Sequence, residues 1–416
     1  MFKSLFKLSG ASIVAQVVSF LVMPVITRMN TPDSLGEYQY FTTLALVLSP
    51  IISGRLDYAI LSAPTRASAL KILRFSVQYV LLLSLVLLLT TPLVNRLVAG
   101  TNLHWVQGYM PILALFLFLC ANFQLAMAFL TNEKKYGLQA TFTITKSVAS
   151  NILKIVFSYI SASGFSLIMS LVVTELFQVA RIVRLSLITK VKKLYRPDLR
   201  FAWRMLRRLR VYPTYVTLTD LMGILMNWFP ILVTGFFYGR TYTGLLGLAF
   251  MVVNTPVYPF ISALRTVCFG ELARERTKKL MFSVYSKSFL IALVPSISGL
   301  LVLGFFSREL FVLVFGEKWI EAGPIAFVCF IPITLSFLLS PIYSSLNHFF
   351  SFQRVFFVIS LIVLVSGVGM TSYIGYRNLD FEYFIMAFAV TMSLSHLSLF
   401  FASIYLVRSR MEGLHE

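Results

Sequence analysis

Hydrophobic segments of about 20 residues recur along the whole chain, and each carries few charged side chains. A single α-helix needs about 20 mostly apolar residues to cross the hydrocarbon layer of a bilayer. Charged residues make up only 12% of the chain, against about 25% in soluble proteins, so we expect an all-α integral membrane protein. Hydropathy predicts about twelve spanning helices, at residues 8–28, 37–56, 74–94, 109–130, 142–161, 165–188, 211–238, 243–264, 283–305, 322–346, 355–376 and 383–407.

The distribution of Lys and Arg predicts the orientation of these helices. Most of the 36 Lys and Arg residues lie in every second gap between spans. The alternate gaps hold only Arg28, Arg96, Arg240, Arg308, Lys318 and Arg377. Because positive charge gathers on the cytoplasmic side of short loops, we predict a bacterial inner-membrane protein with both termini in the cytoplasm. The net charge of +20 then indicates contact with anionic headgroups of membrane lipids, not with nucleic acid.

The sequence shows no catalytic or cofactor-binding motif. The three cysteines, Cys120, Cys268 and Cys329, fall within predicted spans and lack the spacing of a disulfide framework or a metal site. There is no phosphate-binding loop of the GxxxxGK[ST] type and no Ser-His-Asp or paired-carboxylate arrangement. We therefore expect a transporter rather than an enzyme, with no cofactor and no metal ion.

The chain divides into two halves of six predicted spans each. The most basic gap defines an N-terminal bundle at 1–189, a linker at 190–210 and a C-terminal bundle at 211–416. Similar residues recur in both halves: Gly36, Pro50 and Arg55 are matched by Gly244, Pro259 and Arg265, and Trp105, Gly108 and Pro111 by Trp319, Gly323 and Pro324. This pattern predicts a parallel repeat, as in secondary transporters. The alternative is that Pro, Gly and Trp simply gather at helix ends.

The fifth span carries a polar stripe that cannot face lipid. Thr143, Ser147, Ser150, Lys154 and Ser158 recur at three- or four-residue steps, and so share one helix face. Such a face must line a water-filled cavity or a polar helix interface. On the predicted span limits, Lys154 and Glu175 of the sixth span lie at similar depth. They form either a structural ion pair or a proton or cation relay, with Glu175 as the titrating group.

Asp220 is the other carboxylate that the prediction places deep in the membrane, in the seventh span. One interpretation makes it a ligand for a coupling ion. In the other, it caps a bend or accepts a hydrogen bond from a neighbouring helix.

Three arginines at or near span ends are candidate phosphate ligands: Arg28, Arg55 and Arg265. Arginine binds phosphate oxygens bidentately, although an arginine at a span end more commonly extends to the interface. Aromatic rings near these polar residues could stack on sugars or belong to an interfacial belt. The candidate rings are Tyr58, Tyr215 and Trp228.

Three stretches of the chain resemble motifs of Wzx-type O-antigen flippases, within the multidrug/oligosaccharidyl-lipid/polysaccharide exporter superfamily. The first is the segment 24–38, PVITRMNTPDSLGEY, in which a span ends in Arg28 and a Pro-acidic turn leads into the next span. The second, 49–60, is SPIISGRLDYAI, whose Arg-Leu-Asp order departs slightly from the family pattern. The third, 315–323, is FGEKWIEAG.

The resemblance covers nearly the whole chain and implies a V-shaped pair of six-helix bundles. It implies transfer of an undecaprenyl-pyrophosphate-linked oligosaccharide, the O-antigen repeat unit, to the periplasmic leaflet by alternating access. It places Arg28 and Arg55 within family motifs, whereas Arg265, Lys154 and Asp220 rest on spacing alone. Implied protein partners are the O-antigen polymerase and the chain-length regulator.

Two alternatives stay open at this point. A cation-coupled drug or metabolite antiporter of the same superfamily would need an accessible deep acid in the first bundle. A membrane enzyme that polymerises or acylates glycans would need a larger outer loop or a catalytic His/Asp pair.

Overall fold

The protein is described here from a computed structural model, which covers residues 2–184, 199–274, 278–350 and 352–412. Within these ranges the chain forms helices and short connections, without strands. The chain divides into two compact units, Met1–Gly244 and Leu245–Glu416, which are described separately. The predicted all-α fold is therefore confirmed.

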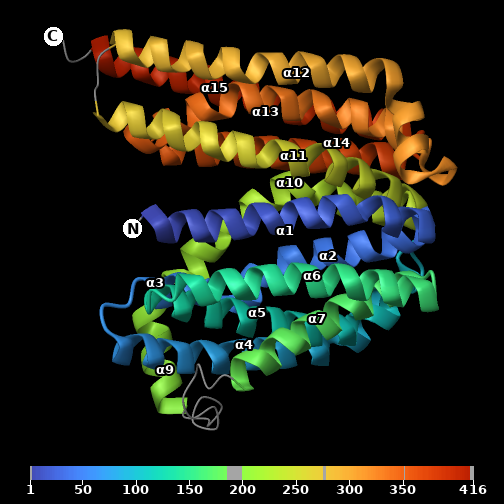
Figure 1. The fold of residues 1–416 in the computed structure, drawn as a ribbon, viewed down its shortest axis with the longest axis vertical. Coiled ribbons are helices and arrows are strands. Elements are labelled where there is room, and N and C mark those ends of the chain that lie inside the picture. Colours follow the sequence, from blue (N-terminus) through green and yellow to red (C-terminus); the bar gives the residue numbers. More distant parts are fainter. Residues whose placement is uncertain (1, 185–198, 275–277, 351, 413–416) are drawn as a thin grey trace. The chain divides into compact units, whose positions relative to one another are not determined.

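Within the described residues, the first unit holds seven long helices and two short ones, which Figure 1 shows by label. Helix α1 packs against α6, α4 against α5, α6 against α7, and α10 against α2. The bounds are α1 (Phe2–Met29), α2 (Pro32–Ser53), α3 (Leu56–Leu61), α4 (Arg66–Val98), α5 (Met110–Asn132), α6 (Tyr136–Ile160), α7 (Gly164–Arg184), α9 (Leu199–Leu209) and α10 (Thr217–Phe237). A 3-10 turn (His104–Tyr109) precedes α5, and a π-helical turn (Tyr212–Val216) precedes α10.

The second unit contains most of α11 and four further long helices. Helix α13 packs against α12 and α15, and α14 packs against α15. The bounds are α11 (Gly239–Arg274), α12 (Lys278–Phe315), α13 (Ala322–Phe350), α14 (Gln353–Tyr376) and α15 (Phe381–Glu412), with a 3-10 turn at Glu317–Trp319.

Each of the twelve predicted spans coincides with a long helix. Among the described residues, nine helices are long and apolar enough to cross a membrane, and α1 contributes a shorter apolar stretch, Ile13–Met29. Helices α2 and α6 are not among these nine, because their polar and charged side chains lower the mean hydropathy. Both lie against other helices of the first unit, α2 against α7 and α10, and α6 against α1 and α7.

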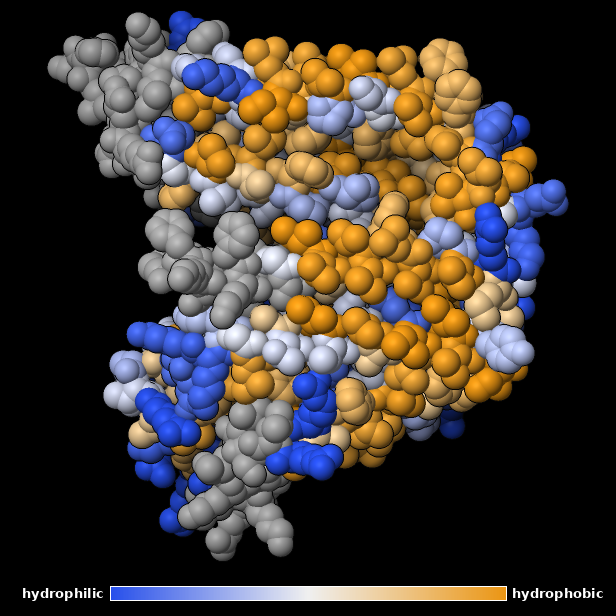
Figure 2. Space-filling model, viewed as in Figure 1, coloured by the Kyte–Doolittle hydropathy of each residue, from blue (hydrophilic) through white to orange (hydrophobic). Residues whose placement is uncertain are grey.

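Apolar side chains fill the first unit and also cover its outer faces. Leu56, Leu73, Leu117 and Phe129 belong to one core cluster, and each is almost fully buried. Leu89 of α4, in contrast, is 78% exposed. Figure 2 shows hydrophobic residues along the helix lengths and hydrophilic residues gathered near helix ends. In lipid, apolar burial does little to hold helices together, so close van der Waals contact and polar bonds between helices must do so.

Local sequence determines where α2 begins and ends. Thr31 caps the helix by accepting a hydrogen bond from the Ser34 backbone N–H at 3.3 Å, and Pro32 occupies the first turn. At the other end Gly54 adopts the left-handed conformation with φ 56°, and its N–H bonds the Ile51 carbonyl. Arg55 follows with φ 48°. Two consecutive left-handed residues thus turn the chain sharply into α3.

The predicted linker at 190–210 differs from the boundary between the compact units. The boundary lies at Gly244–Leu245, because α10 packs on α2. Residues 190–198 of the linker lie outside the described ranges, and α9 occupies most of the remainder. The division into bundles at 1–189 and 211–416 stays a prediction about the two halves of the repeat.

Candidate functional site

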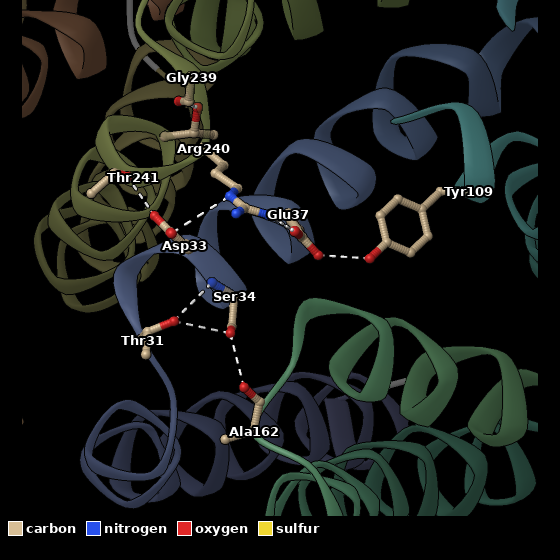
Figure 3. Close-up of polar contacts among 10 residues, drawn as sticks. Thr31, Asp33, Ser34, Glu37, Tyr109, Ala162, Gly239, Arg240 and Thr241 are labelled. Carbon is tan, nitrogen blue, oxygen red and sulfur yellow. Dashed lines mark hydrogen bonds and ion pairs between the residues drawn. The ribbon is translucent and has the colours of Figure 1, made fainter. Parts of the chain in front are cut away.

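A buried carboxylate marks the first turns of α2. Glu37 is 9% exposed. The Tyr109 hydroxyl donates a hydrogen bond to its Oε2 at 2.6 Å, and Nη1 of Arg240 donates to its Oε1 at 2.8 Å (Figure 3). Charge-assisted hydrogen bonds of this kind are about twice as strong as neutral ones. Both oxygens of a buried acid are therefore satisfied by residues from α11 and from the turn before α5.

Arg240 also reaches a second acid, Asp33, so that it bridges two carboxylates. Its Nε lies 3.5 Å from Oδ2 of Asp33, and the Thr241 hydroxyl donates to Oδ1 of the same group. Asp33 and Glu37 are one helical turn apart and therefore face the same way (Figure 3). We call Asp33, Glu37, Tyr109, Arg240 and Thr241 the α2 start cluster.

Two glycines allow this close approach of α2 and the start of α11. A Cβ atom built on Gly36 would overlap the backbone carbonyl of Arg240, and one built on Gly244 would overlap that of Pro32. The contact is reciprocal, because each glycine faces the residue four positions before the other. Gly36 and Gly244 are also the pair that the predicted repeat aligns. Backbones that approach this closely leave no room for any side chain.

At its other end α2 is joined to the start of α10. Nε of Arg55 lies 2.6 Å from Oδ2 of Asp220, and Nη1 lies 4.0 Å from Oδ2 of Asp57. The guanidinium carbon lies 5.7 Å from the centre of the Tyr58 ring. Burial raises the pKa of the Asp57 carboxyl, which lies in α3 outside the predicted spans, while Arg55 opposes that rise. We call Arg55 and Asp220 the α2 end pair.

Asp220 lies eight residues after the start of the span Tyr212–Phe237, close to the depth that the sequence predicted. It lies in the first turn of α10, and its side chain is 29% exposed. The ion pair with Arg55 agrees with the second interpretation, in which Asp220 bonds a neighbouring helix. Arg55 is correspondingly engaged by acids of its own chain.

The predicted proximity of Lys154 and Glu175 is wrong. Glu175 pairs instead with Lys146, whose ammonium also lies 4.5 Å from the centre of the Phe123 ring. The Lys154 ammonium lies over Tyr38 of α2, at 5.0 Å. The error arose from the span limits, because α6 begins at Tyr136 rather than at residue 142. Lys154 is therefore near the end of α6, about 7 Å along the axis from the level of Glu175.

Two residues of the polar stripe of α6, Ser147 and Ser158, and the neighbouring Asn151 bond α1 or Asn30 directly after it. The Ser147 hydroxyl donates to the Ala15 carbonyl at 2.9 Å, and the Asn151 amide donates to the Ser19 hydroxyl at 3.0 Å. Further along, the Asn30 amide donates to the Ser158 hydroxyl at 2.9 Å. For Ser147 and Ser158, the structure thus shows the polar helix interface.

The remaining predicted residues lie on separate helices and turns. Arg28 is exposed in the last turn of α1. Tyr215 is 74% exposed in the π-helical turn, and Trp228 is partly buried in α10. Arg265 is exposed on α11 in the second unit, where Nη2 lies 3.5 Å from the Ser340 hydroxyl. Of the predicted set, the structure brings together Arg55, Asp220 and Tyr58.

The sequence interpretation missed Glu37, Tyr109, Arg240 and Lys146. Asp33 and Glu37 stand one helical turn apart inside the first quoted motif, and that spacing could have signalled a two-carboxylate cluster. Arg240 was counted only as one of the few outer-loop cations. Nothing in the sequence pairs Tyr109 with Glu37. Within the described ranges, no group of His, Cys, Asp and Glu residues has the arrangement of a metal site.

Solved structures with the same fold are membrane transporters. A lipid II flippase, MurJ, in an inward closed conformation superposes with a TM-score of 0.74 at 14% identity, covering 95% of this chain and 87% of that chain. An inward-facing multidrug resistance MATE family transporter of the MOP superfamily gives a TM-score of 0.66 at 15% identity, with coverages of 96% and 95%. A eukaryotic MATE transporter, AtDTX14, gives 0.55 at 10% identity, with coverages of 97% and 95%. These likenesses establish the fold.

The family is shown by sequence. Comparison with curated proteins finds no significant match. The family model described as "Polysaccharide biosynthesis protein" matches residues 25–324, which include the α2 start cluster and the α2 end pair. Since that match covers well over half of the chain, the protein belongs to the polysaccharide biosynthesis protein family and has the multi-pass fold of the MOP superfamily of transporters.

Proposed function

We propose that the protein is a flippase for an undecaprenyl-pyrophosphate-linked oligosaccharide. It carries the O-antigen repeat unit from the cytoplasmic to the periplasmic leaflet of the inner membrane, with both termini in the cytoplasm. The observation that carries the proposal is the polysaccharide-biosynthesis family match on a chain with a flippase-like fold. An O-antigen polymerase and a chain-length regulator would act on the product.

The physical task explains why such a protein is needed. Sugar hydroxyls and a pyrophosphate lose their hydrogen bonds to water in hydrocarbon, and each unsatisfied group costs several kcal/mol. A polyprenyl tail has no such cost and can stay in lipid. Alternating access by the two halves of a parallel repeat gives the polar head a route while the tail remains outside.

The α2 end pair is the proposed contact for the pyrophosphate. Arg55 offers a planar guanidinium suited to phosphate oxygens, and Asp220 pairs with it. A pyrophosphate would compete with Asp220 for the same donors. The neighbouring Tyr58 supplies an aromatic face for a sugar.

The other cations predicted from the sequence are proposed as additional substrate contacts. Arg28, Arg265 and Lys154 are proposed as further contacts for pyrophosphate or acidic sugars, with Tyr215 and Trp228 as additional sugar-stacking rings. Glu175 is the proposed ion-coupling group, although its ion pair with Lys146 opposes that role.

Complementation tests the function. In a host that lacks its own flippase, the wild-type chain should restore the surface glycan. Arg55→Ala should abolish restoration, and Arg55→Lys should retain part of it if charge alone grips the phosphate. Arg96→Ala removes an exposed cation from the end of α4 and serves as the matched control.

Two outcomes would refute the proposal. One is a chain that is made and inserted but leaves the glycan absent. The other is a chain that confers dye efflux with no change in glycan, which would favour the drug or metabolite antiporter.

A further inference from the structure

Helix α9 has two chemically distinct faces. Phe201, Met205 and Leu209 recur at four-residue steps and contact the core cluster of the first unit, together with Ala202 and Leu206. Leu209 is buried, and Phe201 lies against the guanidinium of Arg74 of α4, 5.0 Å from ring centre to carbon. This face packs against the core of the first unit, so the opposite face of α9 is turned away from that core.

The opposite face carries a row of exposed arginines. Arg200, Arg204, Arg207 and Arg208 are all exposed, and Arg210 follows directly after the helix. Within the described residues no carboxylate pairs with any of them, and α9 itself contains no acidic residue. A row of unpaired cations on an ordered surface favours an anionic partner.

The position of α9 indicates which anionic partner. Figure 1 shows α9 running crosswise to the spanning helix α4, beside the end where α4 begins, and the two helices are in contact. A helix with this direction, at the end of a membrane-spanning bundle, lies along the bilayer surface. Lys71 and Arg66 are exposed on the same end of α4.

A tryptophan among the arginines supports contact with the bilayer interface. Trp203 is 57% exposed, and the Arg207 guanidinium carbon lies 5.1 Å from its ring centre. Tryptophan is enriched at the headgroup level of membranes, and guanidinium groups bind phosphate oxygens bidentately. The charge bias that orients spanning helices needs positive residues in the cytoplasmic loop, in any arrangement. It does not explain why α9 packs its apolar face on the protein and exposes its arginines on the other face.

We propose that α9 is an interfacial helix whose arginine face binds the phosphates of anionic phospholipid headgroups. The occupant is the lipid surface itself, and the binding fixes α9 to the membrane. This role is separate from the transported cargo and holds whichever substrate the protein carries.

The test uses purified full-length protein and phospholipids of defined charge. Binding of phosphatidylglycerol and phosphatidylcholine is measured by native mass spectrometry and by lipid-dependent thermal stabilisation. Wild type should prefer phosphatidylglycerol, and the preference should weaken as salt increases. The variant Arg200→Gln/Arg204→Gln/Arg207→Gln/Arg208→Gln should lose affinity by up to about fivefold for each arginine removed.

A matched variant controls for total charge. Arg96→Gln/Arg308→Gln/Lys318→Gln/Arg377→Gln removes four exposed cations of the predicted outer loops and should keep the wild-type preference. If the α9 variant does not fold, the four Arg→Lys substitutions should fold and retain binding through charge.

Three results would overturn the proposal. One is equal phosphatidylglycerol affinity in the wild type and the α9 variant. Another is equal loss in the α9 variant and the control, which would indicate a non-specific charge effect. The third is competition by soluble glycerophosphate as strong as that by the lipid, which would indicate a phosphate site without a membrane.

Discussion

Ion pairs hold both ends of α2, the start to the beginning of α11 and the end to α10, yet the two junctions are built differently. At the start, Glu37 is buried and doubly bonded, beside a crossing of backbones at Gly36. At the end, Arg55 and Asp220 form one short ion pair between partly exposed side chains. The difference indicates that the start of α2 is a fixed junction, whereas its end can exchange one partner for another.

The largest loss of stability is expected from breaking the ion pair between Lys146 and the buried Glu175, against which losses at the two ends of α2 can be compared. Lys146→Met would leave Glu175 buried without its cation, and breaking a buried pair in this way costs about 3–5 kcal/mol. Lys154→Met, on the same helix, should cost much less. Thermal unfolding in detergent measures both variants, and equal losses would contradict the assignment of Lys146 as the partner.

The next largest loss of stability is expected at the close backbone contact between Gly36 of α2 and the start of α11. Gly36→Ala places a methyl group against the Arg240 carbonyl, and forcing atoms into a filled contact costs about 1–3 kcal/mol or more. Gly137→Ala, at a helical glycine with open space around it, should be neutral or stabilising by up to about 1 kcal/mol. A Gly36→Ala protein as stable as the Gly137→Ala protein would remove the case for a fixed junction.

A smaller loss is expected from the buried acid of the α2 start cluster. Glu37→Gln keeps the shape but removes the charge that Arg240 and Tyr109 bond, for a cost of about 1–3 kcal/mol. Tyr109→Phe removes one of these bonds and should cost about half as much. Urea or thermal unfolding of the two variants gives the ranking, and a larger loss in Tyr109→Phe would reverse it.

The smallest effect on stability is expected at the α2 end pair. Asp220→Asn should cost about 0–1 kcal/mol, as for other partly exposed pairs, while changing transport by freeing Arg55. Arg55→Gly should cost less than Arg55→Ala, because glycine tolerates the left-handed conformation at φ 48°. A loss near that of Gly36→Ala would show that both ends of α2 are fixed.

The helices of the fold were predictable because each span is a continuous hydrophobic signal. The predicted limits 211–238 and 355–376 nearly match the helices observed there. The predicted span 142–161 begins later than α6, which begins at Tyr136, because polar residues lower the hydropathy there, and this placed Lys154 at the wrong depth.

The candidate site was only partly predictable. Arg55 and Asp220 were each singled out, but their contact depends on how α10 packs on α2, which no local pattern encodes. The Glu37–Tyr109 bond likewise joins residues that are far apart in the sequence. This bond can be recognised only from the folded structure, in which α2 lies beside the turn before α5.

The reciprocal glycine contact has a consequence for genetics. When a mutation enlarges a side chain, a second mutation can usually restore function by shrinking the neighbour that it strikes. Here the atoms struck are main-chain carbonyls of Arg240 and Pro32, and the facing residue is already glycine. Suppressors of a substitution at Gly36 or Gly244 must therefore arise elsewhere in the chain, by shifting a whole helix.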